Sequence, residues 1–328
     1  MKALVTGATG FIGSNVARAL LKRGHRVKAL IRRGSDTRNI NDLDIERFQG
    51  DIRDAKAVGE AVKECDAVFH TAALYSLWEP NPRLFYEINV VGTQRVLEAC
   101  LEAKVERVVY TSTVAAVAPP RKGVPSNEES WLGDDDLYGN YHRTKTLAER
   151  AALKLHEQGL PLVVVNPTVP IGPWDVKPTP TGRIILDFLR GRLPAYVDTG
   201  FNVVDVEDVA EGHVLAMEKG RIGQRYILGN RNLTLREFLG ELEAVSGKRA
   251  PHIKIPLWLA LGAAYIDNVI QGSILGQEPR IPLEGVMAAR HPMYVDCSKA
   301  VKELGMPQAP VDQAIAKAVT WFRDQGYV

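Results

Sequence analysis

Glycines at positions 7, 10 and 13 follow a short run of apolar and β-branched residues at the start of the chain. Lys2 to Thr6 predict a buried strand, and Phe11 to Arg23 predict a helix, because apolar residues recur there at helical spacing. The turn between them brings backbone N–H groups and a helix N-terminus together, which binds a pyrophosphate where no Cβ intervenes. This setting predicts a dinucleotide site. The residues expected around the pyrophosphate are Gly7, Thr9, Gly10, Phe11, Ile12 and Gly13.

The N-terminal half alternates predicted strands with predicted helices, which is typical of a parallel sheet covered on both faces. Strands are expected near 2–6, 26–31, 45–49, 66–71, 106–112 and 161–166, and helices near 11–23, 54–64, 82–103 and 141–158. We therefore predict an α/β fold, a Rossmann doubly wound parallel sheet with a smaller C-terminal substrate-binding lobe. The NAD(P)-binding domain is placed at 1–170 and the lobe at 171–328, with segments at about 200–230 returning to the first domain.

The pattern changes after Pro167. Closely spaced prolines up to Pro180 predict a long irregular loop. Further helices are expected from Asp208 to Lys219 and from Asp312 to Gln325. The most apolar stretch, Ile255 to Ile270, is too short to span a bilayer, so we predict a core helix or a subunit-contact helix there.

Length and charge limit the class of protein. With 328 residues the chain can bury a large core, and a net charge of +2 with scattered basic residues argues against nucleic-acid binding and against a membrane surface. The cysteines Cys65, Cys100 and Cys297 lie far apart, which predicts buried thiols in a reducing compartment and no metal site. Because the first strand starts at once, we expect no leader segment, no membrane insertion and a cytoplasmic protein.

The end of the second predicted strand indicates which dinucleotide is preferred. A carboxylate there would bind the ribose 2′-OH of NAD, whereas an arginine accommodates the 2′-phosphate of NADP. Arg32 and Arg33 follow the strand, so we predict NADP, with NAD as the alternative and Arg32 as the first choice for the phosphate contact. A solvated basic turn is the other interpretation. Asp51 is placed to reach the adenine amino group with Ile52 against the ring, unless it caps the helix that begins near Asp54.

A phenol and an amine predict acid–base chemistry. Tyr141 and Lys145 are four positions apart on a predicted helix, so both lie on one face. A phenol titrates near 10, and using it at neutral pH means a shift of about three units, or about 4 kcal/mol. An adjacent ammonium favours the phenolate and supplies part of this bias. Hydroxyls of Thr111, Ser112 and Thr113 end the fifth strand, where the crevice of a parallel sheet binds substrates.

Several separate motifs together resemble the extended short-chain dehydrogenase/reductases, the NAD-dependent epimerase/dehydratase family. The resemblance covers nearly the whole chain. The motifs are VTGATGFIG at the start, GDIRD at 50–54, HTAA at 70–73, Asn89, YTSTVA at 110–115, YHRTK at 141–145, NPTVPIGP at 166–173 and VVDVEDVA at 203–210.

The resemblance implies a role for each matching residue. Tyr141 would be the general acid/base, and Lys145 would hold the nicotinamide ribose and lower the pKa of the tyrosine. Thr113 would orient the substrate carbonyl; the family usually has serine there, which leaves Ser112 as a second candidate. Asn89 would support the lysine through a water, or would be a helix-packing amide. Residues implied to border the cofactor are Thr71, Ala72, Ala73, Pro167 and Thr168.

Within the family, the chain looks like hopanoid-associated sugar epimerases and dihydroflavonol 4-reductase-like proteins. Residues 175–200 most resemble the former. Sugar-nucleotide epimerases commonly carry a diphosphate-binding arginine seven residues before the aspartate that is Asp208 here, and this chain has Phe201 at that position. Arg183 or Arg192 could replace the missing arginine.

Aromatic residues indicate a less polar substrate. Tyr75, Trp78 and Trp174 are the candidates, with ordinary core or rim packing as the other interpretation. The substrate contacts we predict are Tyr75, Trp78, Thr113, Trp174 and Arg183.

Three functional hypotheses remain. An NADP(H)-dependent reductase would transfer hydride to a ketone or aldehyde while Tyr141 protonates the oxygen. A sugar epimerase would oxidise a hydroxyl transiently and return hydride to the other face. A non-catalytic NADP-binding sensor would need no proton relay. The reductase is the first prediction, acting on a small molecule as a homodimer that pairs, as in resembling proteins, through the helices near 82–103 and 141–158.

Overall fold

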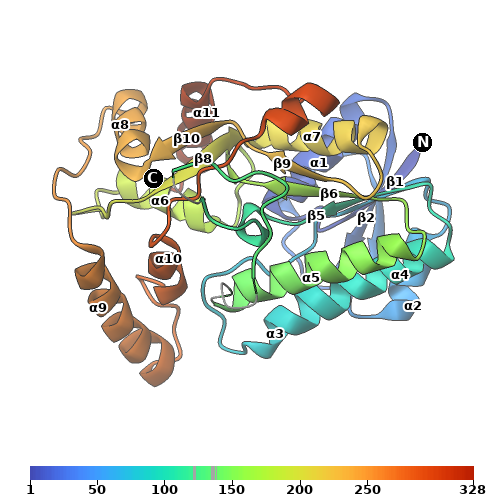
Figure 1. The fold of residues 1–328 in the computed structure, drawn as a ribbon, viewed down its shortest axis with the longest axis horizontal. Coiled ribbons are helices and arrows are strands. Elements are labelled where there is room, and N and C mark those ends of the chain that lie inside the picture. The colour runs from blue at the N-terminus through green and yellow to red at the C-terminus, as the bar shows by residue number, and fades with distance from the viewer. Residues whose placement is uncertain (121–122, 134–136, 138) are drawn as a thin grey trace.

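A parallel sheet forms the centre of the molecule. The computed structural model of the protein describes residues 1–120, 123–133, 137 and 139–328. Within these residues, seven parallel strands form one sheet in the order β3-β2-β1-β4-β5-β6-β9 (Figure 1). The strands are β1 (Lys2–Thr6), β2 (Arg26–Ile31), β3 (Glu46–Gln49), β4 (Ala67–His70), β5 (Arg107–Thr111), β6 (Leu162–Pro167) and β9 (Arg225–Leu228). The predicted α/β fold with a doubly wound parallel sheet is confirmed.

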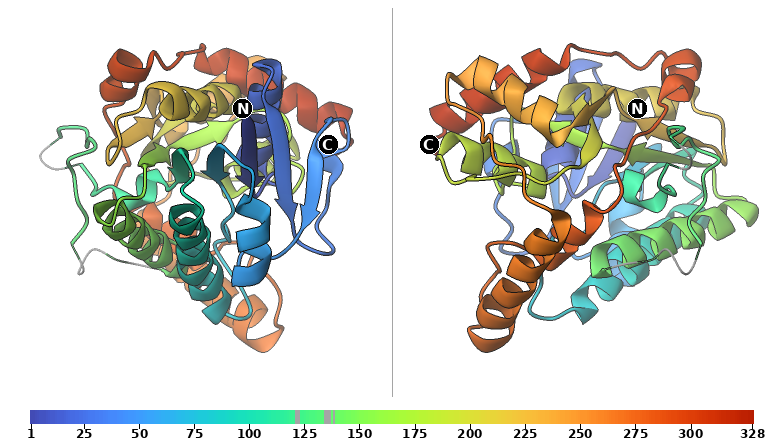
Figure 2. Two further views of the ribbon diagram at one scale, coloured as in Figure 1. Left: turned by 90° about the vertical axis from the view of Figure 1, so that its right-hand side faces the viewer. Right: turned by 60° about the vertical axis from the view of Figure 1, so that its left-hand side comes forward.

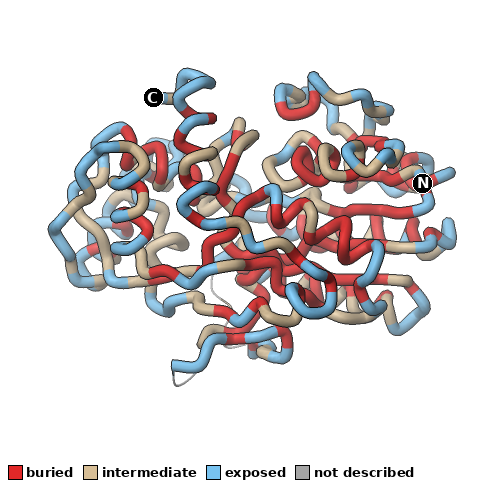
Figure 3. The backbone as a smooth tube through the Cα atoms, turned by 90° about the horizontal axis from the view of Figure 1, so that it is seen from above, coloured by how far each residue is buried: buried red, intermediate tan, exposed pale blue. Residues whose placement is uncertain are grey.

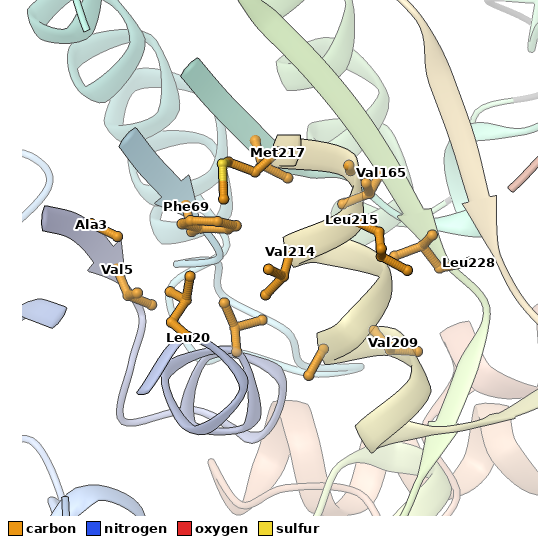
Figure 4. Close-up of a cluster of buried hydrophobic side chains, with 14 of the residues drawn as sticks. Ala3, Val5, Leu20, Phe69, Val165, Val209, Val214, Leu215, Met217 and Leu228 are labelled. Atoms are coloured by element: carbon orange, nitrogen blue, oxygen red, sulfur yellow. The ribbon is translucent and has the colours of Figure 1, made fainter. Parts of the chain in front are cut away.

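Helices cover both faces of this sheet because successive strand residues point to opposite sides. Ala3 and Val5 pack toward α1 and α7 (Figure 4), whereas Leu4 packs toward α2, α4 and α5. Figure 1 shows helices on both faces of the sheet, and Figure 3 shows that the buried segments concentrate in the middle of the molecule. The bounds are α1 (Phe11–Lys22), α2 (Ala55–Val62), α4 (Thr93–Glu102), α5 (Asn140–Glu157) and α7 (Val206–Lys219). The predicted helix near 82–103 is continuous but irregular, with α3 (Arg83–Tyr86) and a π-helical stretch (Glu87–Gly92) before α4. Shorter turns are Arg38–Ile40, Val114–Ala116 and Ala300–Leu304.

A smaller sheet follows β6. Its order is β10-β8-β7, with β7 parallel and β10 antiparallel to β8. The elements are β7 (Val169–Ile171), β8 (Gly200–Asp205), β10 (Arg231–Thr234), α6 (Pro180–Leu189), α8 (Leu235–Ser246) and α11 (Val311–Asp324). The prediction of an irregular loop throughout this proline-rich segment is wrong. Pro170 is tolerated because β7 is an edge strand, and Pro180 starts α6, where its missing N–H costs nothing.

A helical arm leaves the smaller sheet and projects from the rest of the molecule (Figures 1 and 2). We define the arm as residues 257–288, comprising α9 (Leu257–Asp267), a π-helical turn (Asn268–Ile274) and α10 (Leu283–Ala288). The buried residues of α9 are Ala260 and Ala264, whereas Trp258 is 73% exposed. A core helix was therefore the wrong prediction for this stretch, while a subunit contact stays a prediction. None of the helices in the described part of the chain is both long and apolar enough to cross a membrane.

A buried ion pair ties α5 to β9. Arg225 Nε lies 2.9 Å from Glu149 Oε1, and the two side chains are 4% and 2% exposed. The guanidinium also donates to the carbonyl oxygens of Glu128 and Ala116. Breaking such a pair by removing one partner is costly, because the other charge stays buried without compensation.

Arg225→Ala is therefore expected to lower the free energy of unfolding by about 3–5 kcal/mol. Urea denaturation at pH 7 measures the loss. The control is Arg231→Ala, which removes an ion pair with Glu241 in which the arginine side chain is 51% exposed. Equal losses in the two variants would contradict a special role for the buried pair.

Candidate active site

The predicted site residues meet at the carboxyl ends of the strands in the large sheet. From β1 the chain runs to β2 on one side, and later crosses to β4 on the other side of β1. Ligands bind at such a reversal of strand order in open α/β sheets. The loops after β1 and β4 supply the glycine turn and residues 71–73, and the end of β5 and the start of α5 supply the hydroxyls, the phenol and the amine.

The glycine turn has the close backbone contacts that its sequence predicts. Gly7 has φ +74°, and a Cβ there would lie 2.7 Å from the backbone of Ala72. A Cβ on Gly13 would lie 2.2 Å from the Gly7 carbonyl oxygen and 2.6 Å from Thr71 Oγ1. Gly10 is the N-cap of α1 and offers no side-chain cap. No side chain at the N-cap therefore covers the first N–H groups of α1. Such uncovered N–H groups at a helix start can accept an anionic pyrophosphate.

The loop after β4 lies directly against this turn. Thr71 Oγ1 donates to the carbonyl oxygen of Thr6 at 2.7 Å. Ala72, which follows, is half-buried, and Ala73 is exposed. On the other side, Asn39 holds the carbonyl oxygen of Thr9 at 3.0 Å. Phe11 and Ile12 open α1 and are half-buried. The turn after β1 is thus held on both sides by hydrogen bonds from Thr71 and Asn39.

Arg32 and Arg33 are exposed at the end of β2. Within the part of the chain that the structure describes, neither arginine forms an ion pair. The charge of Arg32 also reaches Asp51, where it is one of the causes that lower the pKa of the carboxyl, after the hydrogen bonds from Arg53. A basic surface is thus present where the 2′-phosphate of NADP would lie.

The two residues predicted to contact adenine, Asp51 and Ile52, already have contacts within the protein. Asp51 binds the guanidinium of Arg53 at 2.9 Å, while Asp54 is the residue that caps α2. Ile52 is 9% exposed, and its Cδ1 would lie 2.7 Å from a Cβ on Gly92. A surface cavity of about 420 Å³ adjoins this region and is lined by Asp51, Arg53, Asp54, Glu87, Val91 and Arg95.

Tyr141 and Thr113 are brought together. Tyr141 lies in the first turn of α5, and its phenol lies beside the Thr113 side chain. Burial raises the pKa of Tyr141 to about 12, and the neighbouring Thr113 hydroxyl opposes this rise. Thr113 is fixed by two contacts: its hydroxyl oxygen accepts the Ala115 N–H at 3.2 Å, and its carbonyl accepts Asn166 Nδ2 at 3.0 Å.

Lys145 lies one turn further along α5 and is 2% exposed. Its Nζ donates to the Thr111 carbonyl oxygen at 2.8 Å and to the Tyr110 hydroxyl at 3.2 Å. Burial lowers the pKa of Lys145 to about 8, and the charge of Glu149 limits the fall. Tyr110 stacks on His70 with ring centroids 5.6 Å apart. The YTSTVA motif contains Tyr110, but its sequence carries no signal for a contact with Lys145.

Ser112 and Asn89 have different environments. The Ser112 hydroxyl is buried and has no hydrogen-bond partner among the described residues, so it is available to a ligand. The Asn89 amide is buried and bonds the backbone of Leu74 through both its oxygen and its nitrogen, at 2.7 and 3.2 Å. It also donates to Thr144 Oγ1 at 3.1 Å. Asn89 therefore connects the loop after β4 to α5.

The predicted substrate residues divide into two groups. The Tyr75 ring lies 4.8 Å from the ring of Tyr141, and Trp78 belongs to the same loop. Trp174, in contrast, has φ +75° and lies under the Arg18 guanidinium, 3.6 Å from it. Arg183 pairs with Glu278 of the arm and is 45% exposed. Tyr75 is thus placed beside Tyr141, whereas Trp174 and Arg183 are held by other contacts.

Pro167 and Thr168 end β6 on the same side of the sheet. Thr168 is buried, and its N–H donates to the Leu228 carbonyl oxygen at 3.1 Å.

Asp175 was missed by the sequence analysis. It is 3% exposed and accepts both the N–H and the hydroxyl of Thr179. Burial raises the pKa of Asp175 to about 7.

A second residue that the sequence did not indicate is Glu284 of α10. Its carboxylate accepts the backbone N–H of Tyr141 at 3.2 Å. The contact joins residues 143 positions apart, so no local pattern could reveal it.

The chain is similar to several known proteins. Residues 3–229 match the model of the NAD dependent epimerase/dehydratase family. A Synechocystis sp. protein that carries a dihydroflavonol 4-reductase name is 44% identical over 99% of this chain and 95% of its own. The sterol demethylase protein B of Methylococcus capsulatus is 36% identical over the full length of both chains. The crystal structure of gox2253 superposes with a TM-score of 0.89 at 42% identity, over 99% of both chains.

The match to the family model covers more than half of the chain, and the two relatives extend the similarity into the smaller sheet and the arm. The chain is therefore an NAD(P)-dependent enzyme that acts on a small-molecule substrate and belongs to the NAD dependent epimerase/dehydratase family, the extended short-chain dehydrogenase/reductases.

Proposed function

We propose that the protein is an NADPH-dependent reductase of a ketone or aldehyde of low polarity. The observation that carries the proposal is the phenol of Tyr141, which lies beside the Thr113 side chain and has the aromatic ring of Tyr75 4.8 Å from its own ring. This arrangement presents a proton donor and a second hydroxyl to one substrate oxygen, next to an apolar surface.

The residues of the glycine turn fit the pyrophosphate of the dinucleotide, and Lys145 fits its nicotinamide ribose. Arg32 is the first choice and Arg33 the second for the 2′-phosphate, since both are exposed and a guanidinium offers two donors to a phosphate. Ser112 is a further donor on the same side. When bound, NADPH supplies the hydride that reduces the carbonyl carbon.

Tyr141 supplies the proton. With a pKa near 12, its phenol stays protonated through the neutral range and is ready to donate to a developing alkoxide. Lys145, with a pKa near 8, is mostly charged at pH 7, and its ammonium stabilises the phenolate that the transfer leaves. Thr113 holds the same substrate oxygen in line.

The environment favours a substrate without a diphosphate. Phe201 packs edge-to-face on Phe238 at 5.5 Å, where sugar-nucleotide epimerases commonly have an arginine. Arg183, a candidate replacement, is already paired with Glu278. The names of the two relatives refer to a dihydroflavonol and to sterol demethylation, which supports a substrate of low polarity.

A sugar epimerase is the second candidate, favoured by residues 175–200, which resemble hopanoid-associated epimerases. The two candidates differ in how they treat the cofactor, since an epimerase recycles it internally and a reductase releases it each turnover. Mass spectrometry and absorbance of the dinucleotide released on denaturation separate them. An empty site that binds NADPH more tightly than NADH supports the reductase, whereas tightly retained dinucleotide supports the epimerase.

Tyr141→Phe is expected to lower turnover by about 10²–10⁴-fold, because the substitution removes the proton donor and keeps the ring. The Kd for NADPH, measured by fluorescence titration, should be unchanged. Tyr265→Phe is the matched control, since Tyr265 is 63% exposed on α9. Undiminished turnover in Tyr141→Phe would remove the proton-transfer assignment.

Arg32→Ala should reduce the preference for NADPH over NADH by about tenfold, which corresponds to the loss of about 1.4 kcal/mol of charge-assisted bonding. The ratio of kcat/KM values for the two cofactors measures it. Arg33→Ala is the comparison and should have a smaller effect. A larger effect from Arg33 would reverse the assignment, and no effect from either would contradict NADP.

The pH dependence follows from Lys145. Its pKa is lowered to about 8, so the ammonium is present below that pH and is lost above it. We expect kcat/KM for carbonyl reduction to decline above about pH 8, as the charge that supports Tyr141 disappears. A profile that stays flat to pH 10 would show that the charge on Lys145 is not needed.

A further inference from the structure

Helix α5 begins without a cap of its own. Its N-cap is Gly139, which makes no side-chain capping bond, and the first turn contains no acidic residue. The first N–H groups of a helix have no partner within the helix. Here the carboxylate of Glu284 accepts the backbone N–H of Tyr141 at 3.2 Å. The arm thus supplies the missing cap to the turn that carries Tyr141.

Glycine at position 139 leaves space for the Glu284 carboxylate. A Cβ on Gly139 would lie 2.2 Å from Cδ of Glu284 and 2.3 Å from its Oε1. Gly139 also has φ +63° and ψ 165°, a backbone region open in practice only to glycine. Any other residue at position 139 would therefore both strain the backbone and displace the carboxylate.

The arm contacts the site at several further points. A Cβ on Gly285 would lie 3.0 Å from Leu77, and one on Gly272 would lie 3.0 Å from Nε1 of Trp78. Both neighbours belong to the loop that carries Tyr75. Glu278 pairs with Arg183 of α6. The arm therefore joins α6, the loop after β4 and the first turn of α5.

We propose that Glu284 is a positioning residue that makes the alignment of Tyr141 depend on docking of the arm. The inference rests on the proposed role of Tyr141 as proton donor. With the arm docked, the carboxylate holds the backbone N–H of Tyr141 and keeps the phenol beside Thr113. With the arm undocked, this N–H loses its acceptor, the first turn frays, and the phenol leaves its alignment.

Two variants of Glu284 separate the effect of its acceptor oxygen from the effect of its negative charge. Glu284→Ala removes the acceptor, and Glu284→Gln keeps an acceptor oxygen at the same reach. Glu60→Gln is the control, because it removes an exposed carboxylate that pairs with Lys63 at the end of α2, outside the arm and outside α5. The readouts are hydrogen–deuterium exchange of a peptide covering the first turn of α5, kcat and KM for carbonyl reduction, and the Kd for NADPH.

Glu284→Ala is expected to increase amide exchange in the first turn about fivefold, the effect of losing an N-cap, and to lower kcat about tenfold through misplacement of the phenol. The Kd for NADPH should stay the same. Glu284→Gln should show amide exchange and kcat close to the wild-type values, because it keeps an acceptor oxygen. Glu60→Gln should leave exchange in α5 and kcat at the wild-type values.

Wild-type exchange and kcat in Glu284→Ala would overturn the proposal, as would a fall in kcat that Glu284→Gln does not relieve. If the alanine variant does not fold, Glu284→Asp replaces it, because the shorter side chain withdraws the acceptor and keeps the charge. Faster exchange is then expected, and unchanged exchange overturns the proposal. Absence of NADPH-dependent carbonyl reduction in the wild type would refute the proposed function, while the exchange readout still tests the cap.

Discussion

The close approach of α1 to the turn after β1 and the loop after β4 determines where every other group can lie. A single methyl group on Gly13 would overlap both the Gly7 carbonyl and the Thr71 hydroxyl. Since Gly13 belongs to α1, that overlap would lift the helix from the sheet and also from α7, which packs beside it. The start of α1 would move away from the edge that carries Thr113 and Tyr141. Cofactor binding and core packing therefore depend on the same missing side chain.

Burial shifts the pKa values of the Tyr141 phenol and the Lys145 amine in opposite directions. Both shifts favour the uncharged form of the side chain. The pKa of Tyr141 rises to about 12, and that of Lys145 falls to about 8. Each pKa unit is worth about 1.4 kcal/mol, so the buried site opposes both charges by a few kcal/mol. The Thr113 hydroxyl beside the phenol and the Glu149 charge near the lysine offset part of this cost. Proton transfer thus depends on polar contacts fixed by the ends of β5 and β6.

Local patterns predicted the elements that follow from periodicity. Strands 2–6 and 26–31 have the predicted bounds, because apolar runs between turn residues specify strands locally. Local patterns could not show that Pro170 occupies an edge strand, or that α9 exposes Trp258, since both depend on neighbours distant in sequence. Among the predicted site residues, Arg183 shows most clearly how a partner distant in sequence escapes local patterns. Its chemistry suited an anionic substrate, but its partner is Glu278, 95 residues away.

The two groups on α5 differ in how they depend on the arm. Lys145 is held from within the sheet by Thr111 and Tyr110, and the helix beyond it is anchored by buried residues such as Ala148 and Ala152. Tyr141 is one turn nearer the start of the helix, where its own backbone N–H bonds to Glu284 of the arm. The arm contributes little buried surface through α9, so its undocking costs much less than unfolding the domain. Such an opening would disturb the phenol and leave the amine in place, which separates cofactor binding from proton transfer within one helix.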